Sequence, residues 1–166
     1  MREFIIKFFA TGCFSGYLKP FPGTWGTIPA WLIAWFFFRG DSTLLWGAAI
    51  LATLLSIAIS SLAEPILGHD SRKIVIDEWA GMFIALLFID RAPLFVDESL
   101  LLSDSSLQLY VAAFVAFRVF DVLKLWPARQ LEKLPGGLGI TLDDVAAGIQ
   151  TVLFVQFVIY AAETFA

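Results

Sequence analysis

Long uncharged stretches alternate along this chain with short segments that carry most of the charges. The clearest stretch covers residues 44–63, contains no charged residue, and as a helix would be roughly 30 Å long, the thickness of a bilayer hydrocarbon core. A second uncharged stretch covers residues 146–162 and ends at Glu163. We predict that both stretches form membrane-spanning helices.

Three shorter apolar stretches cover residues 28–38, 78–89 and 107–123. Their uncharged parts are too short to cross a membrane without burying polar ends, so each helix must tilt, thin the bilayer or lie partly inside a bundle. The first nine residues mix charges with apolar side chains and lack a small-residue cleavage site after them. This pattern favours an interfacial helix over a signal peptide.

Composition points to lipid as the solvent of this chain. Of its 166 residues, 59% are hydrophobic and only 16% are charged, which is unlike an average soluble domain. The net charge is −4 and no long basic block is present, so nucleic-acid binding is not expected. No internal repeat or linker divides the chain. We therefore predict one membrane-embedded all-α domain over residues 1–166, a bundle of about four to five hydrophobic helices with a short N-terminal interfacial helix.

The positions of Lys and Arg suggest how the chain is oriented if five crossings are assumed. Most of the basic residues then fall on one side: Arg2, Lys7, Lys19, Arg72, Lys73, Lys124, Arg129 and Lys133. Arg39 and Arg91 fall on the other side, and Arg118 lies within a predicted span. Because cytoplasmic loops carry the excess of positive charge, the first side is predicted to be cytoplasmic.

Acidic residues that are far apart in the sequence fall at the predicted cytoplasmic ends of three helices. They are Asp77, Glu78, Asp121, Asp143 and Asp144. A hard divalent cation such as Mg²⁺ takes oxygen ligands from a few carboxylates and from substrate phosphate. The alternative is structural, because acidic residues favour helix N-termini and residues 141–144 fit a capping box. It explains the adjacent acid pairs less well, since like charges near lipid are costly unless a cation neutralises them.

Arg118, Asp121 and Lys124 are spaced by three residues and would share one face of a helix. In a phosphatase, Asp121 would hold metal while Arg118 and Lys124 bind phosphate oxygens and neutralise charge as the phosphorus–oxygen bond breaks. An intrahelical ladder of ion pairs, with Lys124 anchored at the membrane interface, is the alternative.

Two glycine-rich segments, residues 21–27 and 135–139, each precede a predicted helix on the same side. Backbone N–H groups at a helix start can bind phosphate, and Pro29 suits the first turn of the helix that follows the first segment. Ordinary turns are the alternative. The candidate phosphate-binding residues in these segments are Gly23, Thr24, Gly26, Thr27, Gly136 and Gly137.

His69, the sole histidine, stands beside Asp70, which suits either proton transfer or an ordinary loop. Several phosphatase designs are excluded by missing residues. Cys13 is followed six positions later by Lys19 instead of Arg, so the loop of cysteine phosphatases is absent. One histidine excludes two-histidine phosphoryl transfer within the chain, and neither an Asp-x-Asp pair nor a nucleotide-binding P-loop occurs. Metal-assisted attack by water remains, with direct attack by an aspartate as the alternative.

Six motifs in order along the chain resemble the phosphatidylglycerophosphatase A family. They are residues 15–27, 69–70, 76–81, 117–124, 126–127 and 136–148. The resemblance implies Mg²⁺-dependent hydrolysis of phosphatidylglycerophosphate to phosphatidylglycerol and phosphate, a step of phospholipid biosynthesis at the inner face of a bacterial plasma membrane. It also implies that the acidic motifs bind metal and that Lys19, in the first motif, and His69 contact the substrate.

The resulting hypothesis assigns one or two Mg²⁺ ions to Asp77, Glu78, Asp121, Asp143 and Asp144. Asp77, Asp121 and Asp143 are expected to take part in catalysis together with the two cations of the 117–124 motif, Arg118 and Lys124. Two other classes of protein are alternatives. An ion channel or transporter lined by carboxylates would spread its acidic residues through the membrane depth, and a lipid-binding scaffold would tolerate their neutralisation.

Overall fold

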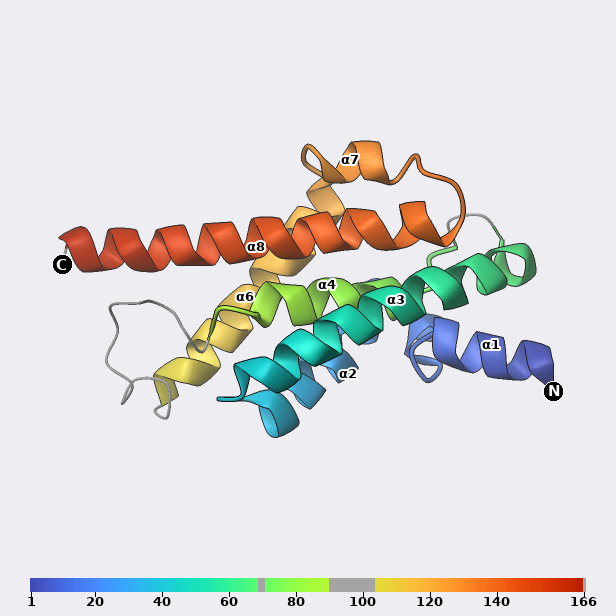
Figure 1. Ribbon diagram of the computed structural model, residues 1–166, viewed down its shortest axis with the longest axis horizontal. Coiled ribbons are helices and arrows are strands. Elements are labelled where there is room, and N and C mark those ends of the chain that lie inside the picture. The colour runs from blue at the N-terminus through green and yellow to red at the C-terminus, as the bar shows by residue number, and fades with distance from the viewer. Residues whose placement is uncertain (69–70, 90–103, 166) are drawn as a thin grey trace.

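The computed structural model describes residues 1–68, 71–89 and 104–165, and these residues form helices and connecting loops without a strand (Figure 1). The predicted all-α class is therefore confirmed. In chain order the elements are α1 (Arg2–Ala10), the short helix η1 (Ser15–Tyr17), α2 (Pro22–Ile33), the π-helical turn η2 (Ala34–Phe38), α3 (Ser42–Leu67), α4 (Ile76–Leu86), α6 (Asp104–Leu123), α7 (Ala128–Leu131) and α8 (Gly137–Phe165).

Three helices are long and apolar enough to cross a membrane. They are α3, α6 over Ser106–Leu123, and α8 over Gly137–Ala161. They expose large apolar side chains, such as Leu54 at 62% and Phe157 at 67% of their surface, which costs little if the surrounding solvent is lipid. The stretches at 44–63 and 146–162 were thus correctly predicted as long helices of a membrane bundle. The stretch at 107–123, predicted as a shorter candidate, is also part of a helix long enough to cross.

The other two predicted crossings are shorter elements, so the assumption of five full crossings is not met among the described residues. The stretch at 28–38 is divided between α2 and η2. The stretch at 78–89 forms α4, whose 11 residues reach only about 16 Å and most of which are buried. Burial inside the bundle, one of the three options for these short stretches, is the one that α4 adopts. The cytoplasmic orientation, which assumed five crossings, stays a prediction.

Helix α4 lies between α3 and α8 in the centre of the bundle and also contacts α2 and α6 (Figure 1). Two glycines allow its close approach to α8. A Cβ atom at Gly81 would lie 2.7 Å from the Asp144 carbonyl oxygen, and one at Gly148 would lie 2.5 Å from the Gly81 carbonyl oxygen. Small residues let membrane helices pack backbone to backbone in this way. The acidic start of α4 is thereby brought beside the start of α8.

The start of α2 differs from the sequence-based expectation. Residues 21–27 were expected to be a loop, but the helix already begins at Pro22, and Pro29 lies inside it rather than in its first turn. Proline suits the first helical position because its fixed φ is helical and its missing N–H would have no partner there. The indole of Trp25 donates a 3.1 Å hydrogen bond to the Pro20 carbonyl and ties the preceding loop to the helix.

The start of α8 also corrects an expectation. The helix begins at Gly137, so Thr141 lies within it and cannot be the N-cap of a capping box. The Thr141 hydroxyl is buried and lies 2.7 Å from the hydroxyl of Ser56 on α3. The Gly137 amide donates to the Ser61 hydroxyl at 3.0 Å. These contacts dock the first turns of α8 on α3.

Candidate active site

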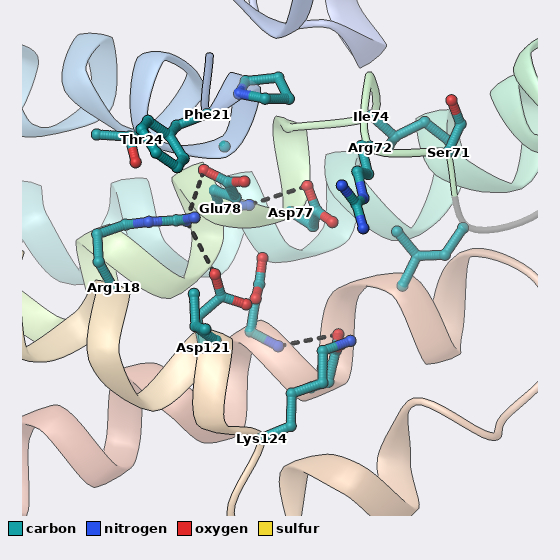
Figure 2. A pocket seen from close by; sticks show the side chains of 16 residues that line it. Phe21, Thr24, Ser71, Arg72, Ile74, Asp77, Glu78, Arg118, Asp121 and Lys124 are labelled. Atoms are coloured by element: carbon teal, nitrogen blue, oxygen red, sulfur yellow. Dashed lines mark hydrogen bonds and ion pairs between the residues drawn. The ribbon is translucent and has the colours of Figure 1, made fainter. Parts of the chain in front are cut away.

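A cavity of about 560 Å³ lies where the ends of α2, α4, α6 and α8 meet, and we call it the acidic cavity (Figure 2). Many of the predicted site residues line it: Gly23, Thr24, Asp77, Glu78, Arg118, Asp121, Lys124, Asp143 and Asp144. Five carboxylates from three helices thus face one space. Asp77 and Glu78 lie in the first turn of α4 and Asp121 near the end of α6, as expected. Asp143 and Asp144 lie further inside α8 than expected, in its second turn.

Arg118 joins two helices on one side of the acidic cavity. Its Nη1 lies 3.0 Å from a carboxylate oxygen of Glu78 on α4 and 2.9 Å from one of Asp121 on its own helix (Figure 2). The predicted Arg118–Asp121 pair is present, but the bond to Glu78 makes Arg118 a cross-link between helices rather than part of an isolated ladder. Its buried Nε–H has no hydrogen-bond partner in the described structure.

Glu78 is the most firmly held of these carboxylates. It is 8% exposed, and in addition to Arg118 it accepts a short 2.5 Å hydrogen bond from the Thr27 hydroxyl on α2. Burial raises the pKa of Glu78 to about 7, although Arg118 and the Thr27 hydroxyl both favour its charged form. A Cβ atom at Gly23 would meet Glu78 and the Arg118 guanidinium, so only glycine lets α2 approach this pair.

Asp77 faces the cavity beside Glu78 and accepts the 3.0 Å hydrogen bond of the Glu78 amide. Burial, followed by the charges of Glu78, Asp143 and Asp121, raises the pKa of Asp77 well above its ordinary value. Part of its surface remains open to the cavity. A further positive charge in the cavity, such as a metal ion, would relieve the repulsion that these acids exert on one another.

Lys124 closes the opposite side of the acidic cavity. It follows the last residue of α6, and its Nζ lies 2.6 Å from Glu132 and 2.9 Å from Asp143. Burial alone would lower the pKa of Lys124, but its hydrogen bonds to Glu132 and Asp143 raise it above the ordinary value. Lys124 therefore connects the ends of α6 and α8 and does not continue a ladder with Asp121.

The donor set of the acidic cavity fits Mg²⁺ by its chemistry. Asp143 and Asp144 are buried at 7% and 3% exposure, and Asp144 lies within hydrogen-bonding reach of Asp121. Carboxylates this close need a proton or a cation between them. Among the described residues, no group of three or more acidic, histidine or cysteine side chains is arranged so that it could hold a metal ion by itself. Mg²⁺ does not require such a group, because it usually keeps several waters and binds through one or two carboxylates plus substrate phosphate.

The remaining predicted residues lie elsewhere. Gly26 packs against Val75, and Thr27 does not line the cavity but bonds three residues that do, Gly23, Glu78 and Arg118. Gly136 and Gly137 pack on α3, and Lys19 lines a neighbouring cavity. Of the predicted phosphate-binding residues in the two glycine-rich segments, Gly23 and Thr24 line the acidic cavity. Their contact with phosphate stays a prediction. His69 lies outside the described residues.

Two residues of the site were missed from the sequence. Arg72 lines the acidic cavity, and its side chain points toward the space beside Asp77 (Figure 2). Its place a few residues before the Asp77–Glu78 pair was a usable signal, but it was considered only for orientation. Glu132, the partner of Lys124, gave no local signal, because α7 is a single turn whose position depends on the packing of the bundle.

Comparison with known proteins supplies the family. Residues 8–159 match the family described as phosphatidylglycerophosphatase A. The chain belongs to this family. Its similarity to phosphatidylglycerophosphatase A of Haemophilus influenzae is 35% identity over 159 residues, covering 93% of this chain and 89% of the relative. Its identity to phosphatidylglycerophosphatase A of Escherichia coli is 32% over 158 residues, which cover 90% of this chain and 80% of the relative.

A protein of Bacteroides thetaiotaomicron named "Putative phosphatidylinositol-3-phosphatase" is 31% identical over 158 residues, which cover 92% of each chain. No solved structure matches the chain. Membership of the phosphatidylglycerophosphatase A family confirms the resemblance seen in the sequence motifs. It also confirms the predicted class of enzyme, a phosphoric monoester hydrolase.

Proposed function

We propose that this member of the phosphatidylglycerophosphatase A family hydrolyses the terminal phosphomonoester of phosphatidylglycerophosphate with the help of Mg²⁺. The products are phosphatidylglycerol and inorganic phosphate. The observation that carries the proposal is the meeting of five carboxylates with Arg118 and Lys124 around one cavity. The names of the Haemophilus and Escherichia relatives support the choice of substrate.

The carboxylates with the least cationic compensation are the expected metal ligands. Asp77 and Asp144 make no ion pair with Arg118 or Lys124. Asp121 and Asp143 each pair with one of these cations through a single carboxylate oxygen. Glu78 is engaged by both Arg118 and Thr27, so it serves the site as a further ligand or as the anchor of Arg118. When bound, Mg²⁺ neutralises phosphate charge and helps to generate the attacking hydroxide from water.

Arg118 and Lys124 bind the nonbridging oxygens of the phosphate from opposite sides of the cavity. As the oxygen nucleophile bonds to phosphorus, the bond from phosphorus to the glycerol oxygen breaks, and the departing alkoxide takes up a proton. Both cations stabilise the charge that develops during this step.

The membrane location follows from the apolar surface of the three long helices. The acyl chains of the substrate stay in the bilayer while its head group enters the acidic cavity at the end of the bundle. Phe21, which is 73% exposed, lines that cavity and offers apolar contact at its edge. We place the protein in a bacterial plasma membrane with the cavity on the cytoplasmic side, as the distribution of Lys and Arg predicts.

The test is phosphate release from detergent-solubilised phosphatidylglycerophosphate by the purified protein. Release is expected with Mg²⁺, to be lost with EDTA, and to be little inhibited by phosphatidic acid. A folded protein that releases no phosphate from any phospholipid would overturn the proposal. The alternative of an ion transporter is disfavoured because the acidic residues of the site gather around one cavity instead of following a path through the bundle.

A further inference from the structure

A second cavity, of about 470 Å³, adjoins the acidic one and has the opposite charge. Lys19, Arg72 and Lys73 line it, and none of the described residues that line it is acidic, so we call it the basic cavity. Arg72 and Pro22 line both cavities. The two spaces are therefore neighbours that share a wall.

The basic cavity is built from segments that hold each other in place. Gly16 packs so tightly on the Lys73 carbonyl that a Cβ atom there would collide with it. The Val75 amide donates a 2.8 Å hydrogen bond to the Ala10 carbonyl at the end of α1. Lys73 also lies over the Tyr17 ring, with its Nζ 5.3 Å from the centroid, a cation–π distance. The backbone segments that carry these cations are thus packed tightly against one another.

The rim of the basic cavity is apolar. Tyr17 and Leu18 line it and are 43% and 49% exposed. Phe21, which lines the acidic cavity, directly precedes Pro22, a residue that lines both cavities. Cations beside exposed aromatic and aliphatic side chains match the boundary between lipid head groups and acyl chains. A free soluble anion would contact only the cations of the cavity, whereas a lipid whose phosphate is attached to diacylglycerol would contact both the cations and the apolar rim.

We propose that the basic cavity binds the phosphodiester of the lipid head group while the terminal phosphomonoester occupies the acidic cavity. This inference rests on the proposed function, because phosphatidylglycerophosphate carries these two phosphates one glycerol apart. Arg72, at the shared wall, contacts the head group between them. Phosphatidic acid has one phosphate, attached directly to diacylglycerol, and can occupy only one cavity at a time. The basic cavity thereby selects lipids that carry both a phosphodiester and a phosphomonoester.

The kinetic test uses the double variant Lys19→Gln/Lys73→Gln, because these residues line the basic cavity only. Its KM for phosphatidylglycerophosphate is expected to rise about tenfold, as two charge-assisted contacts are lost, with kcat changed less than about twofold. Hydrolysis of short-chain phosphatidic acid should stay as in wild type. The matched control Arg129→Gln/Lys133→Gln removes two exposed cations that line neither cavity and should behave as wild type. An equal loss on both lipids, or no loss on either, would overturn the proposal.

A binding test keeps the inference separate from the proposed function. Dihexanoyl phosphatidylglycerol carries the phosphodiester alone and has no phosphomonoester to hydrolyse. Isothermal titration in detergent should show roughly tenfold weaker binding to the double variant than to wild type or the control variant. If wild type binds this lipid through Lys19 and Lys73 but hydrolyses no phosphomonoester, the basic cavity stands and the proposed function fails.

Inorganic phosphate serves as the second ligand in the same titration, because a free phosphate and a lipid phosphate share their oxygen chemistry. Phosphate binding that depends on Lys19 and Lys73, with lipid binding unchanged in the double variant, would assign the basic cavity to the released product and refute the head-group assignment. Lipid binding that depends on both lysines, with phosphate at millimolar concentration failing to displace it, supports the assignment.

Discussion

The acidic and basic cavities share a wall, but the side chains that line them carry opposite net charge. In the acidic cavity, carboxylates outnumber cations and are largely buried, so we expect a phosphate to bind there only together with the proposed metal ion. In the basic cavity, the charged residues that are described, Lys19, Arg72 and Lys73, are all positive and open to solvent, so an anion needs no metal. Metal dependence is therefore the property that should separate the two.

Metal removal is expected to have the largest effect. EDTA should reduce phosphate release from phosphatidylglycerophosphate to the background of the assay, and added Mg²⁺ should restore it, because the acids of the acidic cavity then regain their counter-charge. Binding of dihexanoyl phosphatidylglycerol, measured in the same detergent, should change less than about twofold. Lipid binding that disappears together with activity would show that the two cavities are not independent.

Asp121→Asn should lower kcat by about a thousandfold or more, since it removes a charge of the proposed metal site and one of the two acidic partners of Arg118. The amide has nearly the shape of the carboxylate, so the circular dichroism spectrum and the elution volume in detergent should match wild type. Binding of phosphatidylglycerol should persist. Substantial turnover in this variant would refute the role given to Asp121.

Gly23→Ala tests the close approach of α2 to the acidic cavity. The added methyl group would meet Glu78 and Arg118, and displacing that pair should reduce kcat about a hundredfold. Gly47→Ala on α3 is the control, because a Cβ atom there meets no other atom within 4 Å. Phosphate release and thermal unfolding of both variants provide the comparison. Equal behaviour of the two would mean that the α2 contact does not matter to the site.

Thr27→Val should have the smallest effect. The substitution keeps the side-chain shape but removes the hydroxyl that bonds Glu78 and Arg118, so a loss of about 1 kcal/mol in the free energy of unfolding and about fivefold in kcat is expected. Thr53→Val is the matched control, because the Thr53 hydroxyl bonds only the Ala49 carbonyl one turn earlier in α3. Unfolding in detergent and phosphate release measure the two effects. A change at Thr53 as large as that at Thr27 would contradict the specific role of the Thr27 hydroxyl.

The acidic residues of the site could be chosen from the sequence because their chemistry is local. Adjacent carboxylates in an otherwise apolar chain are costly without a cation, and this argument identified Asp77, Glu78, Asp143 and Asp144 before any fold was known. Their partners could not be assigned in the same way. The spacing of the 117–124 segment placed Lys124 on one helix face with Arg118 and Asp121, with an ion-pair ladder as the alternative. In the structure Lys124 follows the end of α6 and pairs with Glu132 and Asp143 instead.

By itself the sequence determined the helical class, the long membrane helices and the pool of charged residues, because hydropathy and helix length depend on consecutive residues. Only the tertiary structure decided that α4 is buried rather than spanning, that Thr141 bonds Ser56 inside α8, and that Arg72 lies between two cavities. Those outcomes depend on contacts between helices, which Gly81 and Gly148 permit by letting backbones approach closely. Residues distant in the chain meet through such packing, and no local pattern specifies which of them do so.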